Sequence, residues 1–246
     1  MRIVIGIMLL SALTVSVFAD DDDSPPPLWT GQISASYVAN SGNTNNSTAG
    51  ASGEIVWQPT AYKVVVAGEF IRTETENQLG SKRLGTTVRT ERTLPWRLSV
   101  YTEGSYYEDP PSGTRNQLAV NIGGLGHVIK GERHSLALSL SLTQTWENRM
   151  VMPDRDFLGG QIGLDFKLKT NDIVLFEQTA SYVRDFSDST NWRARTATAL
   201  TVALNKRFAF KFSHQLYRNK PDPGKRSTDR TTLASLVVRW PARHSK

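Results

Sequence analysis

The sequence predicts an all-β protein: an antiparallel, up-and-down transmembrane β-barrel of about 12 strands, preceded by a signal peptide that is cleaved on export. Three observations lead to this fold class. The first 19 residues have the pattern of an export signal, apolar and polar residues alternate in segment after segment from Trp29 onwards, and the 6 tryptophans fall at the ends of these segments.

Residues 1–19 form the predicted signal peptide. Met1-Arg2 is a short basic start, Ile3 to Val17 is almost wholly apolar, and the residues before Asp20 are small where a signal peptidase reads them, so we expect cleavage after Ala19. A membrane-anchor helix is the alternative, but it needs about 20 apolar residues. Export without any cysteine means that disulfides do not stabilise the mature chain.

Residues 20–28 form a predicted periplasmic linker, in which an aspartate run precedes Pro25-Pro26-Pro27. Consecutive prolines have no backbone donors and cannot join a sheet. The alternative interpretation is that the aspartates form a calcium site. Adjacent carboxylates without a glycine turn or alternating ligand spacing do not match a loop that folds around the ion, so we favour a solvated linker.

Residues 29–240 form the predicted barrel. In the first segment Trp29, Ile33 and Tyr37 share one face while Gln32 and Ser34 share the other, as in a strand with one apolar side. The same test predicts strands over 29–40, 47–57, 61–73, 82–93, 96–107, 115–129, 134–146, 157–168, 172–183, 190–204, 207–217 and 229–240.

The predicted connections also alternate. Short turns alternate along the chain with longer polar connections. We expect the longer connections over 41–46, 75–81, 108–114, 147–156, 185–189 and 219–228. Tight turns at one end and long loops at the other are typical of outer-membrane barrels. An even number of strands places both ends of the barrel in the periplasm, and residues 241–246 follow as a C-terminal tail.

The tryptophans indicate which face meets lipid. A soluble barrel turns its apolar face inward and buries its largest rings centrally. Here the tryptophans lie on the apolar face at strand ends, and two aromatic belts around an aliphatic band are what a bilayer selects. The predicted interface belt consists of Trp29, Trp57, Trp96, Trp146, Trp192 and Trp240. The expected location is the bacterial outer membrane.

The opposite faces of the strands then line a wet lumen. By strand parity, the charged residues expected there are Lys63, Glu69, Arg89, Glu91, Arg97, Glu103, Asp165, Lys167, Glu177, Arg193, Arg195, Lys211 and Arg239. Glu91 and Arg97 are expected to pair across the turn around Pro95. Arg193 and Arg195, near Gln215 and Tyr217, form either a cationic constriction that favours anions or ion pairs with mouth acids such as Glu177.

Two sequence motifs resemble a known family. The opening Trp29-x-Gly-x-Ile-Ser-Ala-Ser-Tyr, followed by Ser41-Gly42-Asn43-Thr44, and the closing Thr228-Asp229-x-Thr-Thr-x-x-Ser-Leu-Val-Val-Arg-Trp240 are similar to the salt-induced outer-membrane proteins of the YdiY type. The likeness covers nearly the whole mature chain. It implies an outer-membrane barrel of a family without an assigned biochemical function. The tail after Trp240 departs from barrels whose last strand ends the chain with an aromatic residue.

A barrel of this size leaves room for a narrow pore. We therefore expect a passive, porin-like conduit or a structural component of the envelope. A lipase-type enzyme is one alternative: His214 lies on the lipid face, with Thr196 and Thr232 as its nearest outward hydroxyls, but no serine or asparagine completes a catalytic set. A surface binding module that uses the connections 147–156 and 219–228 is another. We expect no catalytic, cofactor-binding or metal-binding residue.

Composition limits the partners. The net charge of +6 would suit a nucleic-acid binder only if the cations were clustered, and they are not. A mean hydropathy of -0.36 and the lack of long apolar segments beyond the N-terminus exclude a helical polytopic membrane protein. The expected partners are the lipid bilayer, lipopolysaccharide and the barrel-insertion machinery, with no nucleic acid.

Overall fold

The computed structural model describes residues 28–40, 46–76, 78–219 and 228–240. The predicted signal peptide, all but Leu28 of the predicted linker and the tail 241–246 lie outside these residues. So do the Ser41–Thr44 motif and most of the connection between the last two strands.

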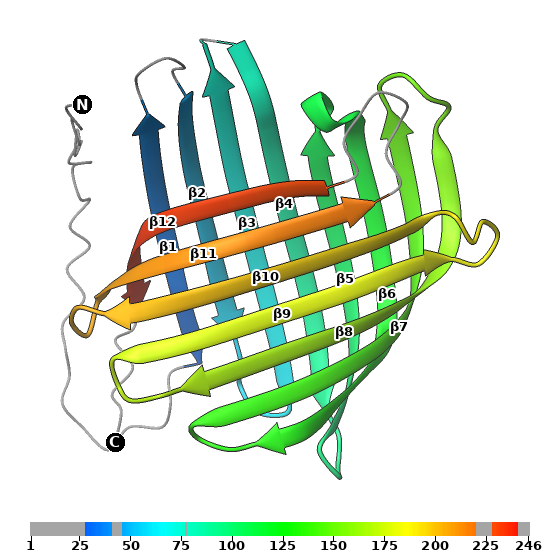
Figure 1. Ribbon diagram of the computed structural model, residues 1–246. Coiled ribbons are helices and arrows are strands. Elements are labelled where there is room, and N and C mark those ends of the chain that lie inside the picture. Colours follow the sequence, from blue (N-terminus) through cyan, green and yellow to red (C-terminus); the bar gives the residue numbers. More distant parts are fainter. Residues whose placement is uncertain (1–27, 41–45, 77, 220–227, 241–246) are drawn as a thin grey trace.

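Twelve antiparallel strands close into one barrel, which confirms the predicted fold class (Figure 1). Each strand pairs with its neighbours in sequence, and β1 closes the ring with β12. The strands are β1 (Trp29–Asn40), β2 (Asn46–Trp57), β3 (Tyr62–Thr75), β4 (Gln78–Thr93), β5 (Leu98–Asp109), β6 (Thr114–Lys130), β7 (His134–Arg149), β8 (Arg155–Lys169), β9 (Val174–Asp185), β10 (Trp192–Ala203), β11 (Phe208–Asn219) and β12 (Thr228–Trp240).

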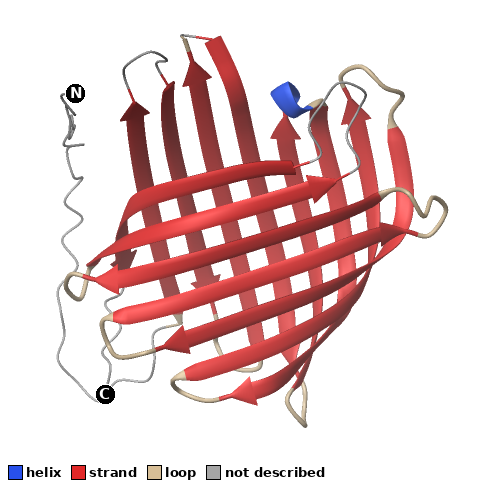
Figure 2. Cartoon of the chain, viewed as in Figure 1, coloured by secondary structure: helices blue, strands red, loops and turns tan. Residues whose placement is uncertain are grey.

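Almost all described residues are strand or turn (Figure 2). A short 3-10 turn, η1 (Pro110–Ser112), precedes β6. Across the described residues, none of the helical structure has the length and apolar character that a bilayer crossing requires.

Several predicted strand boundaries were wrong. β3 runs to Thr75 and β4 begins at Gln78, so the expected long connection over 75–81 is a tight turn in which Glu76 has a φ of 52°. β7 runs to Arg149 and includes Glu147, so the predicted connection over 147–156 begins too early. β5 begins at Leu98 and not at Trp96, because positive φ angles at positions 96 and 97 break the extended backbone there.

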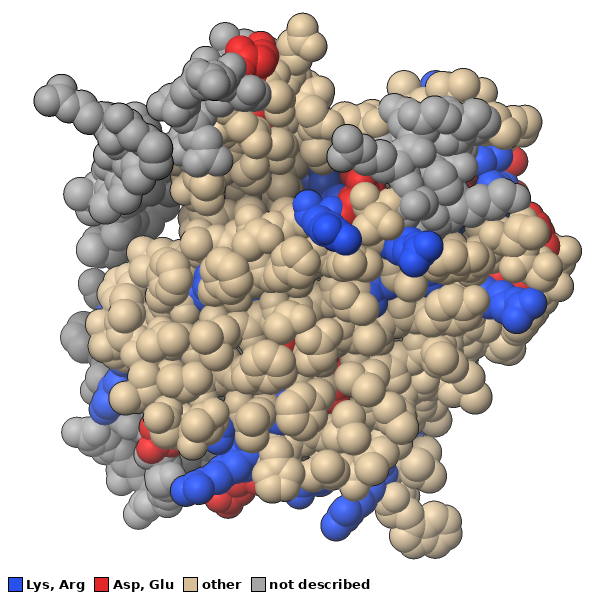
Figure 3. All heavy atoms as spheres, viewed as in Figure 1, with Lys and Arg blue, Asp and Glu red and all other residues tan. Residues whose placement is uncertain are grey.

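The apolar faces point out of the barrel. Leu138, Leu140 and Leu142 along the middle of β7 are exposed, with 67% of Leu140 accessible. The inward residues on either side of Leu142, Ser141 and Thr143, are buried. On the face seen in Figure 3, charged residues gather mainly along the edges of the wall, and the band between is almost wholly uncharged. The strands thus carry an aliphatic band outside and polar groups inside, which is the arrangement of a membrane barrel.

The tight turns are shaped by side chains that bind the local backbone. The Oδ1 atom of Asn171 accepts hydrogen bonds from the amides of Ile173 and Val174, and Oδ1 of Asn205 accepts from the amides two and three residues beyond it. In the same β8–β9 turn, a hydrogen bond from Lys169 holds the pKa of Asp172 below its ordinary value.

Candidate functional site: the barrel lumen

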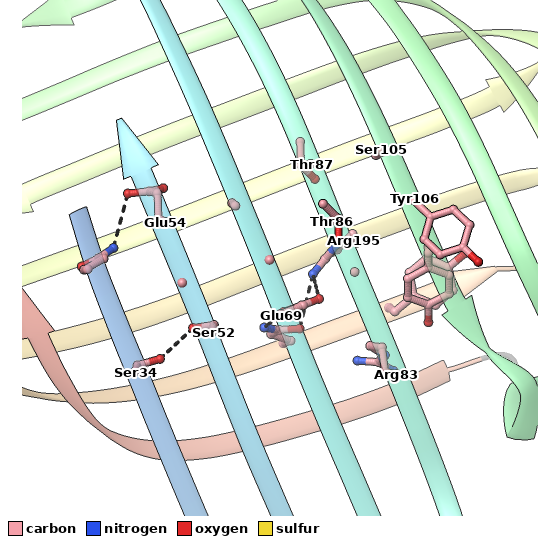
Figure 4. Close-up of a pocket in the computed structure, with 18 of the residues that line it drawn as sticks. Ser34, Ser52, Glu54, Glu69, Arg83, Thr86, Thr87, Ser105, Tyr106 and Arg195 are labelled. Carbon is pink, nitrogen blue, oxygen red and sulfur yellow. Dashed lines mark hydrogen bonds and ion pairs between the residues drawn. The ribbon is translucent and has the colours of Figure 1, made fainter. Parts of the chain in front are cut away.

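The lumen contains a cavity of about 390 Å³. Its wall comes from β1–β6 on one side and from β10–β12 on the other. Most side chains that line it are polar, among them Gln32, Ser34, Ser52, Thr87 and Ser105 (Figure 4). Cross-strand hydrogen bonds hold the wall groups in place: the hydroxyls of Ser34 and Ser52 lie 2.7 Å apart, and Gln32 Nε2 donates to Glu54 Oε1 at 3.4 Å.

An ion pair crosses this cavity. Arg195 Nη2 of β10 lies 2.9 Å from Glu69 Oε1 of β3 (Figure 4). Gln215 of β11 joins both residues, accepting from Arg195 at 3.5 Å and donating to Glu69 Oε2 at 3.4 Å. The Arg195 side chain keeps 47% of its surface exposed, so this bridge is in contact with solvent space.

The long-loop half of the lumen is narrowed by a second layer of side chains, several of which also line the cavity. The rings of Tyr107 and Tyr217 are 6.5 Å apart, centroid to centroid, although β5 and β11 stand opposite each other in the twelve-strand ring. Tyr107 donates a hydrogen bond to Asp109 at 3.1 Å, and Asp109 lies 3.6 Å from Arg83 Nε. This layer narrows the lumen from wall to wall.

Arg193 completes that layer from β10. Its Nη2 donates to Glu147 Oε2 at 2.7 Å, and its Nη1 donates to Gln117 of β6. Its guanidinium carbon also lies 5.1 Å from the centre of the Phe157 ring. Only 10% of the Arg193 side chain and 8% of the Glu147 side chain are exposed, so this is a buried, multiply bonded pair.

The tight-turn half carries two further charge clusters. Arg89 lies 3.7 Å from Glu103 and 3.9 Å from Glu91, and its guanidinium stacks 3.9 Å from the Tyr101 ring centre. His127 Nε2 lies 3.9 Å from the same Glu91.

The second cluster is centred on β8 and β9. Lys167 Nζ is 2.9 Å from Glu177 Oε1. Lys211 and Arg239 act electrostatically on Glu177, and Glu54 and Asp165 act on Lys167, so all six charges belong to one group.

The structure turns most of the predicted lumen residues inward, by register and contact. The residues with inward side chains are Lys63, Glu69, Arg89, Glu91, Glu103, Asp165, Lys167, Glu177, Arg193, Arg195, Lys211 and Arg239. Arg97 is the exception. It lies exposed in the β4–β5 turn with a φ of 63°, so strand parity does not extend to it, and Glu91 faces Arg89 and His127 instead. The predicted Glu91–Arg97 pair is therefore wrong.

The two interpretations of Arg193 and Arg195 are distinguished by their partners. Both arginines are neutralised by carboxylates, Glu147 and Glu69, and so do not form an unpaired cationic ring. Glu177, the predicted mouth acid, binds Lys167 toward the tight-turn end instead.

Several residues of the long-loop layer were missed. Glu147 continues the inward series Thr143, Thr145 of β7, so extending the alternation by one step would have found it. Tyr107 and Phe157 are aromatic residues on the polar face, and the expectation that apolar groups point outward hid them.

The tryptophans of the predicted belt lie at or near strand ends. Trp29 and Trp57 face each other with ring centres 6.0 Å apart at the tight-turn end, and Tyr182 stacks on Trp192 at 6.1 Å at the other. Trp240 ends β12, and Trp146 lies near the end of β7. Trp96 lies in the β4–β5 turn with 91% of its surface exposed.

His214, the centre of the enzyme alternative, lies on the lipid face. Its Nδ1 is 2.8 Å from the hydroxyl of Thr232, as predicted, but Thr198 and not Thr196 stands opposite it on β10. Thr198 donates its own hydroxyl to Gln178, so the polar residues of this outward row bond to one another. Within the described residues, no acid or amide is seen to orient the second ring nitrogen of His214, and no group of three or more potential metal ligands occurs.

Two loops at the long-loop end differ in character. In the connection between β9 and β10, Asp185 Oδ1 accepts from the amide and hydroxyl of Ser187, and Asn191 donates to Asp185 Oδ2. The connection between β7 and β8 exposes the apolar residues Met150, Val151 and Met152. The 219–228 connection, which the surface-module alternative also used, is largely outside the described residues.

The comparisons with known proteins agree with this architecture. The chain is 24% identical over 232 residues to the uncharacterized protein YdiY of Escherichia coli (strain K12), covering 93% of this chain and 90% of that protein. Among solved structures, it is similar to the NanC porin, with a TM-score of 0.51 at 7% identity over 85% of this chain and 97% of that one.

The translocator domain of the autotransporter NalP from Neisseria meningitidis also matches, with a TM-score of 0.46 at 12% identity over 90% of each chain. The porin likeness shows the fold, and the lipid-facing wall makes this an outer-membrane β-barrel protein. A family model described as protein of unknown function, DUF481, matches residues 33–240. The chain belongs to this DUF481 family.

Proposed function

We propose that the protein is a narrow passive conduit for small polar solutes across the outer membrane. One observation carries the proposal: the closed wall encloses a polar cavity of about 390 Å³ that a solvent-exposed ion pair, Arg195–Glu69, spans. A barrel that served only as a scaffold would gain more from filling this space with apolar side chains, since burying charged groups carries a desolvation cost. Barrels of this strand number fall between filled and wide-open ones.

The lining supports a preference for neutral or zwitterionic solutes. Hydroxyl and amide groups of Gln32, Ser34, Ser52 and Ser105 can replace the hydrogen bonds that a polar solute makes with water. Four lumen cations, Arg89, Lys167, Arg193 and Arg195, each lie within 4 Å of a carboxylate, which cancels much of the electric field along the axis. We therefore expect weak selectivity between anions and cations.

Single-channel recording in planar bilayers tests the conduit. We expect small current steps from protein whose folded state is verified by its different migration on a gel before and after boiling. Arg195→Gln removes the cationic half of the bridge and should raise the conductance, whereas Asp172→Asn, in an exposed turn, should leave it unchanged. Folded protein that gives no steps in either form would refute the proposal.

Reversal potentials in a salt gradient test the charge argument. Wild type should show a small reversal potential. Arg195→Glu sets a second carboxylate beside Glu69 and should move the reversal potential toward cation preference. If the variant keeps the potential of wild type, ions do not pass this bridge and the pathway is not the one described.

A further inference from the structure

A patch of arginines lies on the outside of the barrel wall, on β9, β11 and β12. Arg184 is the second-last residue of β9, Arg218 the second-last of β11, and Arg230 the third of β12. All three are exposed, and all belong to the outward face by parity, since their neighbours Asp185, Tyr217 and Asp229 point inward. They therefore share the long-loop end of the lipid-facing surface.

The three arginines form one continuous patch together with the aromatic pair Tyr182 and Trp192. Arg184 stands opposite Trp192 in the β9–β10 register, and the Arg218 guanidinium lies 5.6 Å from the Trp192 ring centre. Tyr182 stacks on the other side of this tryptophan. Arg218 is paired with Thr228 and Leu216 with Arg230, so Arg218 and Arg230 are diagonal neighbours, a separation of about 7–8 Å.

The arginines have no acidic counterpart among the described residues. No carboxylate of those residues lies within ion-pair distance of Arg184, Arg218 or Arg230. Arg72 of β3, at the same end and also outward, differs in this respect because Glu74 lies 2.5 Å from it. Three neighbouring guanidinium groups beside an aromatic stack at headgroup level repel one another unless an anion joins them.

We propose that this arginine patch binds the phosphate groups of lipopolysaccharide in the outer leaflet. Guanidinium groups bind phosphate through paired N–H donors. Tyr182 and Trp192 place the patch at the interface where phosphate-bearing headgroups lie. The patch lies at the long-loop end, which faces the outer leaflet when both barrel ends are periplasmic. The site is on the outer wall and is independent of any flow through the lumen.

Competitive retention of lipid A by folded protein in detergent tests the proposal. We compare bis-phosphorylated lipid A, the same lipid A after enzymatic dephosphorylation, and phosphatidylglycerol, and count bound lipid by native mass spectrometry. Wild type should retain the phosphorylated form most strongly. The triple variant Arg184→Gln, Arg218→Gln, Arg230→Gln should bind it roughly 100-fold more weakly, the scale set by losing three cations near a charged headgroup layer.

Two further variants keep the test decisive. Arg72→Gln removes an outward arginine that already has a carboxylate and should leave retention unchanged. Replacing the three arginines by lysine preserves the charge and should keep a substantial part of the binding, even if the glutamine variant folds poorly. Equal retention of dephosphorylated lipid A, equal retention of phosphatidylglycerol, or equal losses with Arg72→Gln and the triple variant would each overturn the proposal.

Discussion

The two lumen arginines of β10 offer a test of how burial sets the strength of an ion pair. Arg193 and Arg195 lie two residues apart on the same face of the same strand, and each donates to one carboxylate at 2.7 and 2.9 Å. The Arg193–Glu147 side chains are 10% and 8% exposed, whereas Arg195 is 47% exposed. The pairs are therefore matched in geometry and differ in access to water.

Replacing each carboxylate by its amide should separate the two cases. Glu147→Gln leaves Arg193 buried without its counter-charge, which costs about 3–5 kcal/mol in such sites. We expect the low end, about 3 kcal/mol, because Arg193 keeps its contacts with Gln117 and Phe157. Glu69→Gln should cost less than about 1 kcal/mol, since Arg195 can turn to water.

Urea unfolding of the barrel in lipid vesicles, followed by tryptophan fluorescence, gives both free energies of unfolding. The double variant Arg193→Met, Glu147→Gln should regain part of the stability that Glu147→Gln loses, since no buried cation remains. Costs for Glu147→Gln and Glu69→Gln that agree within error, or a double variant less stable than Glu147→Gln, would refute the assignment of this difference to burial.

The structure of the barrel wall and its turns leads to three further predictions. A Cβ at Gly123 would lie 2.3 Å from the Leu140 carbonyl oxygen, so Gly123→Ala should reduce the folded, heat-shifted fraction on gels, while Gly124→Ala, whose nearest contact is 3.9 Å away, should not. Leu140→Arg should cost about 2–4 kcal/mol in vesicle unfolding if this position faces the bilayer midplane. Arg97→Gln should leave single-channel conductance unchanged, because Arg97 lies in a turn.

The wall of the barrel could be predicted from the sequence because the direction of each side chain depends only on its position within its own strand. A strand turns successive side chains to opposite faces, so Leu138, Leu140 and Leu142 already determine where Ser141 and Thr143 point. The tryptophans also indicate how deep each residue lies in the membrane, since they mark the strand ends. This alternation fails where the backbone leaves the extended region, as it does at Arg97.

The contacts across the lumen could not be predicted in the same way. Arg195 and Glu69 are 126 positions apart, and the strands that carry them meet only because the closed ring sets β10 across from β3. Tyr107 and Tyr217 touch for the same reason. Which inward residues meet depends on the tilt and stagger of all the strands around the ring. The pattern within one strand does not contain this information.

The distribution of charge over the barrel depends both on which face each strand residue occupies and on which residues meet across the lumen. Inside, Arg89, Arg193, Arg195 and Lys167 each have a carboxylate within 4 Å. These four lumen cations are therefore offset locally, and the positive excess behind the net charge of +6 lies mainly on the outer wall and in the loops. In the proposed conduit, this pairing of the lumen charges keeps the electric field on a passing solute small. In the proposed lipid binding, the outward arginines remain available to phosphate groups of the outer leaflet.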